Sequence, residues 1–232
     1  MTMLGFDADD TLWHNERFFT LTQARFAELM GDFAGRDHLE DRLLAAERRN
    51  IGRYGFGVKG FTLSMIETAI EVSEARVSAT VIAELLEAGR EMLAHPIELL
   101  PHVETTITTL AASYKLVLIT KGDLLDQERK LAQSGLGPCF QAVEVVSEKT
   151  PEIYTRIFDR HGMGARQGIM VGNSMKSDIL PMLEAGGRAI HIPDRGVTWA
   201  LDHAEAPASH PRLLTLESME NLAEALHKFA LE

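Results

Sequence analysis

Short apolar runs alternate with longer stretches of helical periodicity over most of this 232-residue chain. The short apolar runs are residues 3–6, 115–120, 142–146, 168–172 and 188–192. They are too short for helices and do not alternate strictly with polar residues, which is typical of strands buried on both faces. Strands separated by helices predict a parallel sheet that is covered by helices on both sides.

The segments between these strands have the end signals of helices. Helices are expected at about 101–113, 123–134, 150–162 and 174–186, and from about 216 onward. Thr150 followed by Pro151 is a typical helix start, with a hydroxyl N-cap and a proline in the first turn. Pro181 should kink or shorten its helix because proline lacks the backbone N–H donor.

A block of amphipathic helices separates the first two strands. From Asn15 to about Leu93, apolar residues recur every three or four positions in four stripes, which is the pattern of helices. This block is too long for an ordinary crossover between parallel strands. We therefore expect an α/β fold in which residues 1–14 and 95–232 form a Rossmann-like parallel-sheet core and residues 15–94 form an inserted all-helical domain. Residues 50–60, which contain four glycines, read as a loop within that domain.

Composition excludes several classes of protein. The formal charge is 23 − 34 = −11, which argues against a nucleic-acid partner. One cysteine, Cys139, allows no disulfide within the chain and suits a reducing cytoplasm. There is no signal-peptide profile and no apolar run of the roughly 18 residues needed to span a bilayer, so neither export nor a membrane partner is expected.

Polar residues follow the predicted strands at the points where those strands end. The first strand ends at Asp7 and Asp9, the second at Thr120-Lys121-Gly122, and Lys149 follows the third. The fourth ends at Asn173, with Asp178 five residues beyond. Because ligands of open α/β sheets bind at the carboxyl ends of the strands, these side chains should meet at one edge.

The chemistry that this set could support is phosphoryl transfer through an aspartyl-phosphate. An aspartate can attack phosphorus, provided that a cation such as Mg²⁺ offsets the repulsion between two anions. Lys149 and Thr120 could bind the phosphate oxygens, and a second acid could serve the leaving group. Alone, each residue has a structural explanation: Asp7 as a helix cap, Thr120 in a turn, Lys149 at the surface, Asp178 at a helix dipole.

The run Asp7-Ala8-Asp9-Asp10-Thr11-Leu12 resembles the first motif of the haloacid dehalogenase-like (HAD) superfamily. Thr120, Lys149 and Gly172-Asn173-Ser174 with Asp178 resemble its other three motifs, in the same order, and the helical block is similar to a C1-type cap. The resemblance implies Asp7 as nucleophile and metal ligand, and Asp9 as general acid/base and backbone metal ligand. It also implies Thr120 and Lys149 as phosphate ligands and Asp178 as a metal ligand.

Three residues depart from the motifs of that family. Asp10 stands where glycine is usual and has no catalytic role, so a helix cap is the default interpretation. Lys121 stands where asparagine is common, and Lys121 and Gly122 are candidates, together with Thr120, to bind the phosphate group. Asn173 replaces the usual aspartate and removes one negative charge; we expect it to hold a metal-bound water and to lower metal affinity.

The leading hypothesis is a Mg²⁺-dependent phosphatase acting on a small phosphorylated metabolite. A haloacid dehalogenase is an alternative within the family, but it needs neither a metal nor Asp9. A phosphonatase would need a cap lysine, for which Lys59 is a candidate. An alternative of another class is a non-catalytic binding or regulatory protein that keeps the fold.

Substrate selectivity is expected to reside in the cap. Arg53, Tyr54 and Lys59 are candidates for substrate contact, and a solvated helix connection is an equally good interpretation of the segment that carries them. The sequence leaves the identity of the substrate open, and it does not distinguish a monomer from a homodimer.

Overall fold

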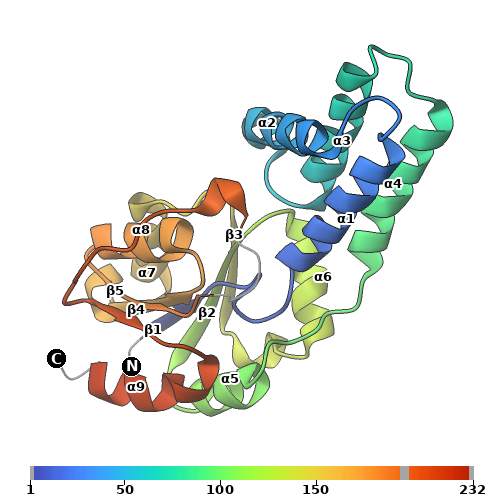
Figure 1. Cartoon of the computed structure of the whole chain (residues 1–232). Coiled ribbons are helices and arrows are strands. Elements are labelled where there is room, and N and C mark those ends of the chain that lie inside the picture. The colour runs from blue at the N-terminus through green and yellow to red at the C-terminus, as the bar shows by residue number, and fades with distance from the viewer. Residues whose placement is uncertain (1–2, 194–198, 230–232) are drawn as a thin grey trace. The chain divides into compact units, whose positions relative to one another are not determined.

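The structure, a computed structural model, describes residues 3–193 and 199–229 of the chain (Figure 1). The strands are β1 Met3–Phe6, β2 Lys115–Lys121, β3 Ala142–Val146, β4 Gly168–Gly172, β5 Arg188–His191 and β6 Leu213–Thr215. The α-helices are α1 Glu16–Leu29, α2 Arg36–Tyr54, α3 Val58–Val72, α4 Ala79–Ala94, α5 Val103–Ala111, α6 Leu124–Ser134, α7 Pro151–His161, α8 Leu180–Glu184 and α9 Leu222–Phe229. The fold is therefore α/β, and the segment inserted between β1 and β2, all of which is described, contains helices and no strand of the sheet.

All six strands pair in parallel, in the order β3-β2-β1-β4-β5-β6. β1 lies at the centre, between β2 and β4. The order reverses here, because the chain passes from β1 through β2 to β3 on one side and through β4 to β6 on the other. The carboxyl ends of strands at such a switch point are where open α/β sheets bind ligands.

The two faces of the sheet bury different residues of the same strands. Leu4 and Phe6 of β1 pack in a cluster with α5, α6 and α9. Met3 of β1 and Ile119 of β2 pack in a second cluster with α7 and α8. Burial on both faces explains why these strands read as continuous apolar runs in the sequence.

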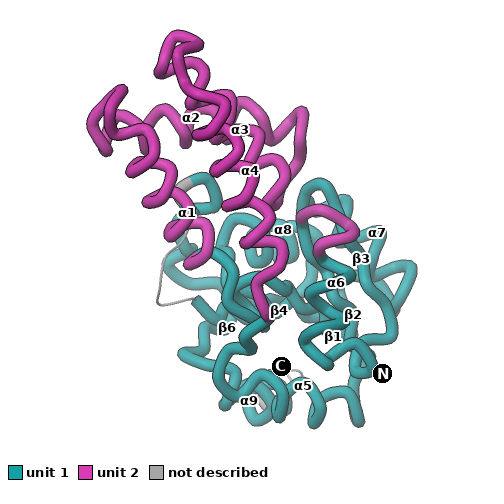
Figure 2. Tube along the Cα trace, turned by 90° about the vertical axis from the view of Figure 1, so that its right-hand side faces the viewer, with its two compact units in different colours: residues 1–16, 97–121, 127–232 teal, residues 17–96, 122–126 magenta. Residues whose placement is uncertain are grey.

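The chain forms two compact units, which Figure 2 distinguishes. One consists of residues 1–16, 97–121 and 127–232 and contains the sheet; the other consists of residues 17–96 and 122–126. The helical unit has its own apolar core, built around Phe26, Met30, Leu43, Met65 and Leu85. We call them the sheet unit and the helical unit. Residues 122–126 group with the helical unit although they follow β2 directly.

The prediction of a loop at residues 50–60 is wrong. Residues 50–54 are the last part of α2, and α3 already begins at Val58. The turn is made by Gly55 and Gly57, whose φ angles of 73° and 107° lie in the region that favours glycine. Gly52 lies within α2 at an exposed position, where a glycine costs helix stability without ending the helix.

Two other differences concern the second half of the chain. The sequence pattern missed β6, which has three residues and follows Pro211 closely. The last helix begins at Leu222, after a 3₁₀ turn at Met219–Asn221, later than the expected position near 216. Among the described residues, no helix combines the length and the apolarity needed to cross a membrane.

Candidate active site

The carboxyl end of β1 places Asp7 between the ends of β2 and β4. Phe6 pairs with Leu118 on one side and with Val171 on the other. The Asp7 N–H donates to the Val171 carbonyl at 2.9 Å, so the backbone of Asp7 still belongs to the sheet. Its side chain is 9% exposed. The central strand therefore holds this carboxylate in a fixed and largely dehydrated position.

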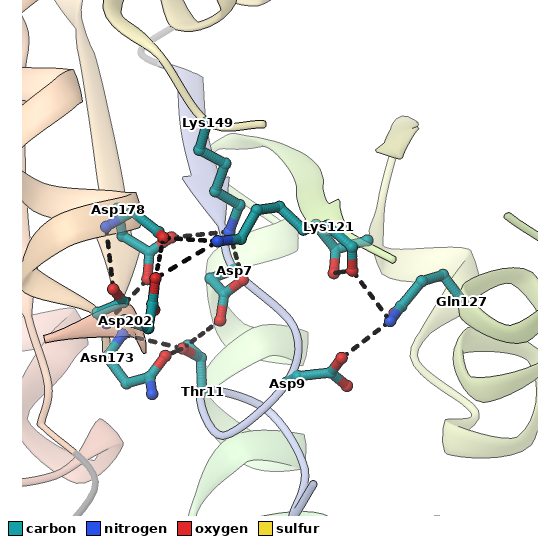
Figure 3. Close-up of polar contacts among 12 residues, drawn as sticks. Asp7, Asp9, Thr11, Lys121, Gln127, Lys149, Asn173, Asp178 and Asp202 are labelled. Atoms are coloured by element: carbon teal, nitrogen blue, oxygen red, sulfur yellow. Dashed lines mark hydrogen bonds and ion pairs between the residues drawn. The ribbon is translucent and has the colours of Figure 1, made fainter. Parts of the chain in front are cut away.

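Asp7, Lys149 and Asp178 form a buried ionic cluster (Figure 3). Lys149 Nζ donates to Asp7 Oδ1 and, at 2.7 Å, to Asp178 Oδ1. The Lys149 and Asp178 side chains are each 1% exposed. Two carboxylates thus share one ammonium group, which leaves a formal charge of −1 in a region with little access to water.

This arrangement changes the pKa values of its members. Burial, and after it the Asp178 carboxylate, raise the pKa of Asp7 from 3.8 to about 7, although Lys149 opposes both effects. Burial lowers the pKa of Lys149, but the carboxylates of Asp178 and Asp7 outweigh that effect and hold the pKa above its ordinary value. The ammonium therefore stays charged, and the excess negative charge falls on the carboxylates.

Thr11 links the first and the fourth motif. Its Oγ1 lies 2.8 Å from Asp7 Oδ2 and 3.0 Å from Asn173 Oδ1, and it accepts the N–H of Asn173 at 3.0 Å. A hydroxyl has one proton, so it can donate to only one of the two oxygens at a time. Asp7 and Asn173 are consequently held on opposite sides of one hydroxyl group.

Gly172 provides the space that Asp178 occupies. A Cβ atom at this position would lie 2.3 Å from Asp178 Oδ2, far inside van der Waals contact. The same Oδ2 accepts the N–H of Ser174 at 2.9 Å. The glycine at the end of β4 therefore permits the carboxylate to fold back against the strand.

Asp178 lies in a π-helical turn, Met175–Ile179, and not in the first turn of an α-helix as expected. The short helix α8 begins at Leu180 immediately after this turn, and Pro181 is its second residue. Proline cannot donate a hydrogen bond to the carbonyl of Ser177, four residues earlier. That carbonyl instead accepts the hydroxyl of buried Tyr154 at 3.0 Å. Pro181 and Tyr154 together explain how the widened turn is stabilised.

Asp9 points away from Asp7 (Figure 3). Its Oδ1 accepts from Trp13 Nε1 at 2.7 Å and from Lys130 Nζ at 2.9 Å, and its Oδ2 accepts from Gln127 Nε2 at 2.8 Å. Three donors therefore orient this carboxylate. To reach a group bound at Asp7, the side chain must rotate and give up these hydrogen bonds.

Asp10 has the structural role expected of it. Its carboxylate accepts the N–H groups of Asn15 and Glu16, at the start of α1. Its φ angle is 60°, in the left-handed region that glycine adopts freely and aspartate tolerates better than most residues. This backbone angle explains why a position at which the family motif usually has glycine can hold an aspartate.

The residues at the end of β2 divide between the two units. Thr120 is 1% exposed and its Oγ1 donates to the Lys121 carbonyl at 3.2 Å. Lys121 Nζ donates to Ser177 Oγ at 2.8 Å and lies 3.4 Å from Asp202 Oδ1. Gly122, with a φ angle of 133°, begins the segment that groups with the helical unit.

The candidate substrate contacts of the cap all lie in the helical unit. Arg53 and Tyr54 are in the last turn of α2, and the Tyr54 hydroxyl donates to Glu67 at 2.7 Å. Lys59, in the first turn of α3, forms an exposed ion pair of 2.8 Å with Asp123. These residues are not part of the cluster around Asp7, which lies in the sheet unit.

The sequence interpretation missed several residues around the site. The missed residues are Thr11, Gln127, Lys130, Ser177 and Asp202. Thr11 lies within the first motif and Ser177 lies next to Asp178 of the fourth, so both could have been noticed there. Asp202 lies in a 3₁₀ turn, Ala200–Asp202, that follows β5 and carries no signal of its own.

The residues at this edge fit a magnesium ion. Within the described ranges, no group of three or more His, Cys, Asp and Glu side chains is placed to hold a metal. Asp7 and Asp178 are two carboxylates with a formal excess charge of −1, and the Asn173 amide oxygen lies 3.0 Å from Thr11 Oγ1, which also contacts Asp7. Mg²⁺ typically takes one or two carboxylates and fills its other positions with water and phosphate oxygens, which matches this set.

Comparisons with known proteins agree on one family. A model of haloacid dehalogenase-like hydrolases matches residues 1–186. A haloacid dehalogenase-like family hydrolase from Xanthomonas campestris is 39% identical, with a TM-score of 0.89, over 100% of this chain and 92% of that one. The comparison with curated proteins gave no match.

Two more distant structures share the fold. The putative HAD-hydrolase YfnB from Bacillus subtilis, crystallised with magnesium, is 17% identical with a TM-score of 0.67, over 98% of each chain. A predicted phosphoglycolate phosphatase from Haemophilus somnus is 16% identical with a TM-score of 0.64, over 97% of each chain. At these identities the likeness concerns the fold alone.

Proposed function

Because this chain belongs to the haloacid dehalogenase-like hydrolases, we propose that it is a Mg²⁺-dependent phosphatase that hydrolyses a small-molecule phosphomonoester through an aspartyl-phosphate. The observation that carries the proposal is the sharing of one buried ammonium group, that of Lys149, by Asp7 and Asp178. The two carboxylates carry an excess negative charge that a divalent cation can neutralise. A phosphate group needs such a cation to approach the anionic Asp7.

Asp7 acts as the nucleophile in this proposal. One of its Oδ atoms attacks phosphorus, the bond from phosphorus to the leaving oxygen breaks, and an aspartyl-phosphate forms. Asp7, Asp178, the Asp9 carbonyl and the Asn173 side chain, directly or through a water, would hold a magnesium ion. When bound, this ion would neutralise charge between the Asp7 carboxylate and the phosphate group. Lys149 and Thr120 orient the phosphate oxygens, and the ammonium offsets part of the charge that develops on them.

Asp9 serves both half-reactions as acid and then as base. After rotating away from Trp13, Gln127 and Lys130, it gives a proton to the leaving alkoxide. It then takes a proton from the water that attacks phosphorus, and the bond from phosphorus to the Asp7 oxygen breaks. Inorganic phosphate leaves, and both aspartates return to their starting states.

Hydrolysis of p-nitrophenyl phosphate tests the proposal directly. We expect turnover with Mg²⁺ and loss of turnover when EDTA removes the metal. No turnover with metal, or turnover unaffected by EDTA, would contradict the proposal. A panel of phosphorylated sugars, nucleotides and carboxylic acids would then define the substrate.

A haloacid dehalogenase is the second candidate, and the orientation of Asp9 is the observation that favours it. That reaction attacks carbon and needs neither the second acid nor a metal, so an Asp9 turned away from Asp7 would not impede it. Release of halide from 2-haloacids in the presence of EDTA would favour this candidate.

Lys59, the residue that a phosphonatase would use, is engaged with Asp123.

A further inference from the structure

Lys121, Ser177 and Asp202 form a polar triad at the same edge of the sheet as the ionic cluster around Asp7. Lys121 Nζ donates to Ser177 Oγ at 2.8 Å, and Ser177 Oγ donates in turn to Asp202 Oδ1. The ion pair between Lys121 and Asp202 has a separation of 3.4 Å. Ser177 directly precedes Asp178, so the triad is joined through the backbone to the cluster.

Asp202 is anchored in place by the π-helical turn. Ser177 of that turn binds its carboxylate, and the neighbouring Lys176 donates through Nζ to the Leu201 carbonyl at 2.6 Å. The Asp202 N–H also donates to the Trp199 carbonyl at 2.9 Å. Two adjacent residues of one turn therefore fix the short 3₁₀ turn that presents Asp202.

The pair formed by Lys121 and Asp202 is largely shielded from solvent. The two side chains are 14% and 20% exposed, so water and salt screen their charges less than those of surface pairs. Figure 3 shows both side chains pointing toward the region that also holds Lys149 and Asp178. Lys121 thus adds an ammonium group to that of Lys149, and Asp202 adds a carboxylate to those of Asp7 and Asp178.

A carboxylate and a phosphate group compete for the same ammonium group. Both are anionic acceptors that can bind the Lys121 ammonium, whereas the two anions repel each other. A phosphate group bound at the ends of β1 and β2 would therefore draw Lys121 away from Asp202. When the phosphate leaves, the anchored carboxylate recovers the ammonium.

We propose that Asp202 is a positioning residue that competes with bound phosphate for Lys121 and thereby promotes the release of inorganic phosphate. The inference rests on the proposed phosphatase function, because it requires a phosphate group beside Lys121. It assigns a role to a segment after β5 that the motifs of the family resemblance do not include.

Asp202→Asn tests this role, because it removes the charge and keeps the size and the Oδ1 acceptor of the side chain. We expect the inhibition constant of inorganic phosphate, measured against p-nitrophenyl phosphate with Mg²⁺, to fall by about fivefold. Glu205→Gln is the matched control, since it removes the same charge from an exposed residue three positions away. This control should leave the inhibition constant unchanged. A purely structural role of Asp202 would not make phosphate bind more tightly.

Lys121→Met supplies the second arm of the test. We expect it to raise the inhibition constant, and we expect Asp202→Asn to have no further effect in the Lys121→Met background. The inference fails if Asp202→Asn leaves phosphate binding unchanged or weakens it, or if it strengthens binding equally without Lys121. Calorimetric titration with inorganic phosphate measures phosphate binding directly, so the role of Asp202 can be tested separately from turnover. A wild type that does not hydrolyse phosphomonoesters contradicts the function, whereas an active wild type with an unresponsive Asp202→Asn contradicts only the role of Asp202.

Discussion

At the scale of single residues, three neighbouring aspartates have three different environments. Asp7 is buried beside Lys149, Asp9 is held by three donors on the other side of the loop, and Asp10 binds the first N–H groups of α1. The same chemical group therefore serves different ends within four positions, because the backbone at the end of β1 turns each side chain in a different direction.

Asp7→Asn should abolish turnover of p-nitrophenyl phosphate, by more than about a thousandfold in kcat, because an amide is a poor nucleophile. Asp10→Asn is the matched control, since it makes the same chemical change three positions away and keeps a side chain that can cap a helix. We expect the control to keep kcat close to the wild-type value. An Asp7→Asn variant with activity near that of the wild type would refute the role of Asp7.

Asp9→Asn should affect substrates according to their leaving groups. An alkoxide needs a proton as it leaves, whereas p-nitrophenolate is a stable anion and needs none. We therefore expect kcat/KM to fall at least about tenfold more for an alkyl phosphomonoester than for p-nitrophenyl phosphate. Equal losses for both substrates would mean that Asp9 does not act as the acid in the first step.

At the scale of elements, the path from β4 into the π-helical turn decides where Asp178 lies. Gly172 leaves room for the carboxylate, Pro181 removes one backbone donor, and Tyr154 replaces that donor with its hydroxyl. A regular α-helix from Ser174 would rotate Asp178 relative to the strand. The irregular turn is therefore part of the site and not only a connection.

Gly172→Ala should weaken the use of magnesium, because the added Cβ would lie 2.3 Å from Asp178 Oδ2 and displace it. We expect the Mg²⁺ concentration for half-maximal activity to rise by about tenfold or more. Gly35→Ala is a suitable control, since no atom lies within 4 Å of the added Cβ and its φ angle is −67°. An unchanged magnesium requirement in Gly172→Ala would separate Asp178 from the metal.

At the scale of the whole molecule, the sheet unit brings together side chains from five separate segments of the chain. Asp7, Lys121, Lys149, Asp178 and Asp202 follow β1, β2, β3, β4 and β5 in turn or end them. Their charges sum to −1, which agrees in sign with the acidic balance of the chain as a whole. A divalent cation bound here should stabilise the folded state, because the unfolded chain does not assemble the site.

Mg²⁺ should therefore raise the melting temperature of the wild type. At a concentration about a hundredfold above the dissociation constant, binding contributes about 2.7 kcal/mol, or roughly 5–10 °C for a chain of this size. In Asp178→Asn we expect this increment to disappear, whatever the melting temperature without metal. Differential scanning calorimetry at matched ionic strength measures it, and an increment that survives in Asp178→Asn would place the metal elsewhere.

The order and type of the main elements could be predicted from the sequence because local pattern determines them. Buried parallel strands appear as short apolar runs, and Thr150-Pro151 or Gly135 mark helix ends directly. The convergence of Asp7, Lys149 and Asp178 followed from a general rule about strand ends. β6 escaped detection because a three-residue edge strand has too little pattern, and residues 50–54 were misread because exposed helix tolerates glycine.

The sequence by itself determined that Asp7, Lys149 and Asp178 lie at the carboxyl edge of the sheet, because each of them follows a buried strand. Only the tertiary structure decided the direction of each side chain and its partners. Asp9 turns to Lys130 and Asp202 reaches Lys121 across 121 and 81 positions of sequence. Such pairs depend on the packing of distant segments, so no local pattern contains them.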